Sequence, residues 1–243
     1  MKSLRLAAVA LLAPCAALAN STSEIDASGG SLVPSLGITI GLSGESSLPG
    51  ASGSSHAIEL GYAAARAKDK DRLRAGDNPI VVGDQAFSGA QDLNYSQSIQ
   101  FADLAYRYRR WLDRDSRFAV EVLGGAGWAA LNLKVDGAAQ SAQERLNNAG
   151  VLLGVGALWR FLPNTALQAR AMGLFSGSTE GVTRAGRFEV TLTQALGRHA
   201  QVRAGLGALS VYSARENDGD SNSAKSPIRA SAGGLVLGFD LLF

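Results

Sequence analysis

Charged side chains recur at alternate positions within several apolar segments of this chain. Arg107 and Arg109 lie two residues apart in one segment, and Glu121, Arg160 and Arg203 lie in others. Alternate residues of an extended chain point to the same side, so these charges would share one face while apolar side chains occupy the opposite face. Carboxylates and guanidiniums gathered in this way could hold one another as ion pairs, or could select small anions.

We therefore expect a charge cluster in the interior of the folded protein. An unpaired buried ion costs several kcal/mol, which favours a polar plug that locks the structure over an arginine-lined constriction. Asp103 and Glu189 share the same face but should lie farther from the short connections between strands. The expected cluster comprises Glu59, Arg107, Arg109, Glu121, Arg160, Arg170, Arg203 and Asp240.

Catalytic chemistry has weaker support in the sequence. His56 and His199 are the two histidines, and Ser55 precedes His56, but neighbours on a strand point to opposite faces and cannot easily share a proton. We assign no catalytic residue, expect no enzyme, and keep a lipid-modifying enzyme as the second alternative function. Residues 216–222 place oxygen-bearing side chains at alternate positions as a calcium loop does, but the glycine of that loop is missing, so no metal or other cofactor is expected.

The N-terminus has the three parts of a secretory signal peptide. Lys2 and Arg5 precede an apolar run over 6–18, and residues 17–19 form a small-x-small cleavage site. Residues 1–19 would then be removed, together with Cys15. The remaining chain has no thiol, which excludes disulfides and cysteine chemistry, and it has no net charge to favour a nucleic-acid partner.

Apolar and other side chains alternate with a period of two in most of the remaining chain, which predicts an all-β fold. Connections between the alternating segments are short and long in turn, as in transmembrane barrels with short periplasmic turns and long outer loops. The expected long connections are residues 69–96, 136–148, 177–186 and 216–226, and the expected short ones are 113–116, 162–165 and 197–200. The eight expected strands are about 55–68, 97–112, 117–135, 149–162, 165–178, 186–198, 200–215 and 235–243.

The number of strands depends on residues 20–54, a leader rich in Ser and Gly that precedes the expected barrel of 55–243. Within this leader, residues 36–43 alternate as clearly as any counted strand. Bacterial single-chain barrels have an even number of strands. We therefore expect eight strands, with ten as the alternative if residues 36–43 and 73–87 supply one strand each.

The C-terminal run from Leu235 to the terminal Phe243 resembles that of the small bacterial outer-membrane β-barrel family. The resemblance implies a transmembrane antiparallel up-and-down β-barrel in the bacterial outer membrane. It also implies that Phe239, Leu241 and Phe243 form a recognition signal for the barrel-assembly machinery. Outer-membrane lipids and lipopolysaccharide would surround such a barrel.

We expect a monomer with a structural or cell-surface interaction role and a charge-plugged lumen. A narrow porin for small solutes, anions among them, is the alternative, because the interior face is rich in arginine. Residues 66–74 contain five basic side chains that could contact lipopolysaccharide phosphates. Asp69 and Asp71 interleave with them, which favours a solvated loop.

Overall fold

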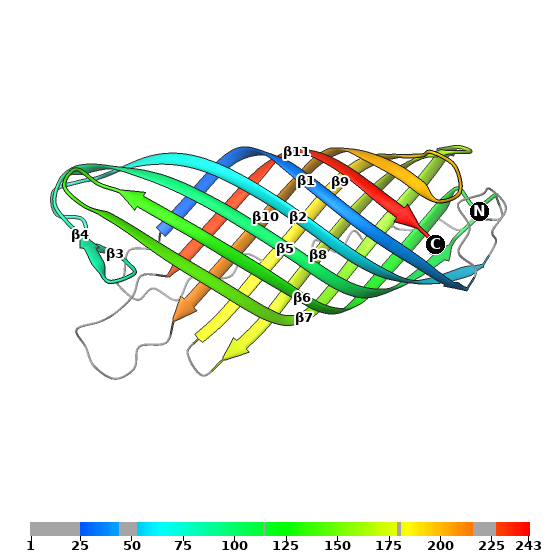
Figure 1. Ribbon diagram of the computed structural model, residues 1–243, viewed down its shortest axis with the longest axis horizontal. Helices are drawn as coiled ribbons and strands as arrows, with labels where there is room; N and C mark the ends of the chain where they lie inside the picture. The colour runs from blue at the N-terminus through cyan, green and yellow to red at the C-terminus, as the bar shows by residue number, and fades with distance from the viewer. Residues whose placement is uncertain (1–24, 44–52, 114, 179–180, 216–226) are drawn as a thin grey trace, which may run out of the picture.

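The computed structural model describes residues 25–43, 53–113, 115–178, 181–215 and 227–243. The fold is all-β, and none of these residues belongs to a helix long and apolar enough to cross a membrane. Figure 1 shows long tilted strands wrapped around one axis. The strands are β1 (Ile25–Ser43), β2 (Ser54–Leu73), β3 (Ile80–Val82), β4 (Gln85–Phe87), β5 (Gln91–Trp111), β6 (Phe118–Asp136), β7 (Ser141–Leu162), β8 (Thr165–Ser178), β9 (Gly181–Ala195), β10 (Ala200–Arg215) and β11 (Ile228–Leu242).

Nine of the described strands close into a barrel in the order β1-β11-β10-β9-β8-β7-β6-β5-β2. Neighbours are antiparallel except β1 and β11, which pair in parallel from Ile25↔Ile228 to Thr39↔Leu242. The prediction of a β-barrel is confirmed, but eight strands is wrong. Residues 36–43 do not lie outside the wall: they belong to β1, which is inserted between β2 and β11 and bonds to both.

Residues 73–87 do not supply the further ring strand that the ten-strand alternative requires. Residues 80–87 form the short strands β3 and β4, a separate two-stranded sheet outside the ring. An even count is required only when every neighbouring pair is antiparallel. The parallel seam between β1 and β11 removes that requirement, so residues 36–43 join the ring without a tenth strand.

The strands are strongly staggered around the barrel. A path that starts at Ile38 and steps from each residue to its partner on the next strand returns to β1 at Asp26, twelve residues away. With about 3.3 Å per residue and about 4.8 Å between strands, this stagger tilts the strands by roughly 40°. A barrel of this size has an interior that side chains can fill.

The predicted short connections are confirmed at one end of the barrel, which we call the short-turn end. At the opposite, long-loop end, the strands extend farther than expected. β2 continues to Leu73, and only residues 137–140 separate β6 from β7. Much of the segments 69–96 and 136–148, expected as loops, is therefore strand whose outward face is polar.

The lumen has two differently filled halves. Toward the long-loop end it is packed with buried apolar side chains, including Phe101, Leu131, Leu174 and Leu209, each at most 1 % exposed. The β3–β4 hairpin adds Phe87, which is fully buried in the same core. Toward the short-turn end the interior is charged.

Prediction: an engineered disulfide will report the closure by β1. In a Cys15→Ser background, the pair Leu36→Cys/Phe239→Cys should oxidise to a disulfide, because these residues are partners on β1 and β11. The pair Tyr62→Cys/Phe239→Cys should stay reduced, because Leu36 lies between the two and a disulfide spans at most about 7 Å between Cα atoms. Mass spectrometry after oxidation measures both pairs, and bridging of the second pair alone would indicate an eight-stranded ring.

Candidate functional site: a charged chamber in the lumen

The charged half of the lumen contains a cavity of about 590 Å³, which we call the chamber. It extends from Asn164 and His199 in the short turns to Asp103 and Arg187 deeper in the barrel. Its side chains come from strands all around the ring, because inward-facing residues alternate with outward-facing ones along each strand. The chamber is therefore assembled only when the barrel closes.

Two buried glutamates form the centre of the first ion-pair group in the chamber. Glu121 accepts hydrogen bonds from Arg109 Nε at 2.8 Å and from Arg170 Nε at 2.8 Å. Glu59 forms an ion pair with Arg107 and accepts a hydrogen bond from Arg170 Nη1 at 2.8 Å. Arg170 thus bridges the two glutamates, which lie on β2 and β6 while Arg170 lies on β8.

A second group lies around β9, β10 and β11. Arg203 donates to Glu189 Oε2 at 3.0 Å and to Asp240 Oδ1 at 2.9 Å. Arg187 lies 2.6 Å from Glu189 Oε1 and 3.5 Å from Asp103 Oδ1. This group therefore ties three consecutive strands to Asp103, which belongs to β5 on the other side of the lumen.

The two groups together contain as many acids as arginines. The five carboxylates are those of Glu59, Asp103, Glu121, Glu189 and Asp240, and the five guanidiniums are those of Arg107, Arg109, Arg170, Arg187 and Arg203. A neutral set of this kind avoids the large cost of isolated charges in a medium of low polarity. We conclude that these residues hold the walls together and leave no net charge in the network.

Glycines on the inner face make room for the ion pairs. A Cβ at Gly156 would lie 2.8 Å from Glu121 Oε2 and 3.1 Å from Arg170 Cγ. A Cβ at Gly238 would lie 2.5 Å from Ser35 Oγ and 3.2 Å from Arg203 Nε. Both positions need a residue without a side chain so that long charged side chains can cross the lumen.

The structure places seven of the eight expected cluster residues in this network. Arg160 is the exception: it lies at the short-turn mouth of the chamber, with its guanidinium 4.6 Å from the ring centre of Trp111. Arg187 takes the place of Arg160 in the charge balance, and it was not among the expected cluster residues although it lies within the expected strand 186–198. Its spacing of two residues from Glu189 was a usable signal, since both must face the same side.

The histidines and Ser55 do not form a catalytic group. Ser55 is buried on the inner face, whereas His56 points outward and lies against Tyr106 through a hydrogen bond to its hydroxyl. His199 Nδ1 lies 3.1 Å from the backbone oxygen of Leu242. Within the described residues, no group of three or more His, Cys, Asp or Glu side chains could hold a metal ion. The segment 216–226 and the predicted signal peptide with Cys15 lie outside those residues.

The arrangement can therefore cross-link the barrel wall and can hold polar solutes that enter from the short-turn end. It contains no placed nucleophile and base within the described residues. The chain matches no protein-family model and no curated protein sequence.

Prediction: removing one carboxylate from the network will destabilise the barrel strongly. Glu121→Ala leaves Arg109 and Arg170 buried without their shared partner, which should lower the free energy of unfolding by about 3–5 kcal/mol. Asp92→Ala is the control, because it breaks the exposed pair with Arg72 and should cost less than about 1 kcal/mol. Urea unfolding of the refolded protein, followed by tryptophan fluorescence, measures both; equal effects would contradict a structural role for the network.

Proposed function

We propose that this protein is a β-barrel of the bacterial outer membrane with a structural or cell-surface interaction role. The observation that carries the proposal is a reversal of polarity along the strands. On β6, Val120 and Val122 point outward beside the inward Glu121, whereas farther along Leu131 and Leu133 are buried inward. The outside of the barrel is thus apolar at one level and polar at another, which fits a wall that leaves a bilayer and enters water.

The same reversal occurs on β5. Leu104 and Tyr106 are exposed on the outside next to the inward Arg107, while Ile99 and Phe101 are buried inside above them. Ordinary soluble barrels keep apolar side chains inside along their whole length. The reversal on adjacent strands therefore supports an apolar environment around the short-turn half of the barrel.

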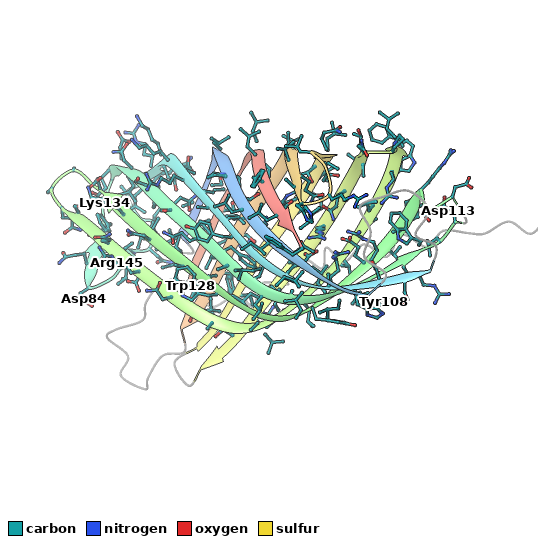
Figure 2. All side chains as sticks on the ribbon, turned by 45° about the vertical axis from the view of Figure 1, so that its right-hand side comes forward. Asp84, Tyr108, Asp113, Trp128, Lys134 and Arg145 are labelled. Atoms are coloured by element: carbon teal, nitrogen blue, oxygen red, sulfur yellow. The ribbon has the colours of Figure 1, made fainter. Side chains whose placement is uncertain are left out.

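The height of the apolar outer band agrees with a membrane. On β7 the outward side chains from Val151 to Phe161 are apolar at every second position, and most of them are more than half exposed. Ten steps of about 3.3 Å along a strand tilted by roughly 40° cover about 25 Å, the usual apolar height of outer-membrane barrels. Aromatic residues lie toward the edges of this band: Figure 2 shows Tyr108 near the short-turn end and Trp128 toward the long-loop end.

The lumen supports a structural rather than a conducting role. Paired charges span the chamber, and the apolar core from Phe101 to Leu209 fills the lumen above it. A narrow porin would need a wet path through this core. The long strands β2, β5, β6 and β7 extend beyond the apolar band at the long-loop end, where they would present their polar outer faces to the cell surface.

Prediction: the refolded protein will insert into bilayers but will not conduct. Its strands should be protected from protease in phosphatidylcholine vesicles, since the apolar band would lie in the hydrocarbon. In planar bilayers it should give no stable conductance steps, because the apolar core closes the lumen. A protein that stays outside the vesicles would overturn the membrane proposal, and steady conductance steps altered by Arg170→Ala would favour the narrow porin instead.

The C-terminus supports the proposed assembly signal. Phe239 and Phe243 are exposed, and the backbone of Phe243 donates a hydrogen bond to Thr39 O at 2.9 Å and accepts one from Gly41 N. The last residue is thereby tied to β1, and its ring remains accessible to another protein.

Prediction: the Phe243 ring, separately from its backbone, will contribute to assembly in cells. Phe243→Ala keeps the backbone bonds to β1 and should reduce the amount of heat-modifiable barrel in the outer membrane several-fold. Phe161→Ala, an exposed aromatic at the same end but outside the C-terminal run, serves as the control. Normal assembly of the Phe243→Ala protein, measured by the gel shift on heating, would contradict the assembly signal.

A further inference from the structure

The structure separates charges that alternate in the sequence. Arg66, Lys68 and Lys70 point outward from β2 and are exposed, while Asp69 shares the lumen side with the buried Ala67. Asp69 accepts a hydrogen bond from the backbone N–H of Ser28 on β1, at 3.2 Å. The interleaved aspartates that favoured a solvated loop therefore lie on the other side of a strand, and the outer face of β2 is basic.

The neighbouring strands extend this face with hydroxyl and amide groups. Arg66 is the partner of Ser98 on β5, and the row continues through Asn132 on β6 to Arg145 on β7. The next row joins Lys68, Ser96, Lys134 and Gln143 in the same order. We call these eight residues, with Lys70, the basic face. Figure 2 labels two of its members, Lys134 and Arg145, near the long-loop end.

Two carboxylates share the outward side, and each lies next to a cation. Asp92 is 3.6 Å from Arg72, and Asp136 is 2.8 Å from Lys134. On the outward side of residues 66–72, 92–98, 132–136 and 141–147, six cations therefore stand against two carboxylates. The excess positive charge favours an anionic ligand, and the interspersed hydroxyl and amide groups suit sugar hydroxyls.

The basic face lies directly above the apolar band on the same strand. Below Arg66 on the outside of β2 follow Ala64, Tyr62, Leu60 and Ile58, three of which are large and exposed. A ligand with an anionic head and long apolar chains would match both parts at once, because its chains would lie against the band while its head met the cations. A soluble anion would use only the upper part.

We infer that the basic face binds the phosphorylated sugar headgroup of a glycolipid in the membrane leaflet at the long-loop end. The inference rests on the proposed membrane insertion, which fixes the height of the face relative to the lipid. Phosphate oxygens would accept hydrogen bonds from Arg66, Lys68 and Lys70. The sugar hydroxyls would contact Ser96, Ser98 and Asn132.

The test uses the refolded full-length protein and lipid A, a diphosphorylated disaccharide lipid, with native mass spectrometry to count bound lipid. The variant Arg66→Gln/Lys68→Gln/Lys70→Gln should weaken lipid binding about tenfold or more. The control Arg110→Gln/Arg117→Gln/Arg198→Gln removes the same charge at the short-turn end and should change binding less than about twofold. Lipid A without its phosphates should bind the unaltered protein as weakly as the first variant binds lipid A.

Three outcomes of this experiment would contradict different parts of the proposal. Competition by glucosamine-1-phosphate as strong as by lipid A would overturn a lipid ligand in favour of a soluble sugar phosphate. Equal binding by the two variants, in protein that is protected from protease in vesicles, would overturn the basic face alone. A protein that fails to insert would overturn the membrane proposal and this inference with it.

Discussion

Charge neutrality inside the lumen is the constraint on which the rest of the barrel depends. Arg170 on β8 reaches Glu59 on β2 and Glu121 on β6, whereas Arg203 on β10 joins its two neighbouring strands through Glu189 and Asp240. These four ion pairs link strands both across the lumen and along the ring. These pairs need glycine on the facing strands and a fixed register, since a slip by one residue would turn each charge outward. The network therefore selects one closure of the barrel as well as stabilising it.

The nine-stranded ring follows from the same register. β1 places Ser35 within 3.1 Å of Arg203 and leaves room at Gly37 for Asp240. If β1 were absent, β2 and β11 could close an eight-stranded antiparallel ring, but Arg203 would lose this contact. The inner face of β1 is thus fitted to the ion pairs, and its outer face adds Leu36 and Ile38 to the apolar band.

Alternation predicted the barrel, the eight central strands and most of the charge cluster, because one physical rule governs all three. The alternation did not reveal where the apolar side chains change faces: Leu131 and Leu133 alternate as regularly as Val120 and Val122 within the expected strand 117–135, but they face inward. At the long-loop end the expected strands were too short, as at residues 69–73 and 141–148, because the outward side chains there are polar. The parallel pairing of β1 with β11 has no signature in the sequence, since it depends on which edges remain when the other strands have paired.

The two halves of the barrel are stabilised differently, which limits where a ligand could bind in each half. Toward the long-loop end, a conventional apolar core with Phe87 over it closes the lumen, so recognition there must use the outer faces of the strands. Toward the short-turn end, the chamber is reached past Asn164 and His199, which among the described residues is the side from which a small polar solute could enter. In the proposed orientation, the chamber faces the periplasm and the basic face lies at the cell surface. Communication between them would have to pass through the packed core, which rigid strands and close packing oppose.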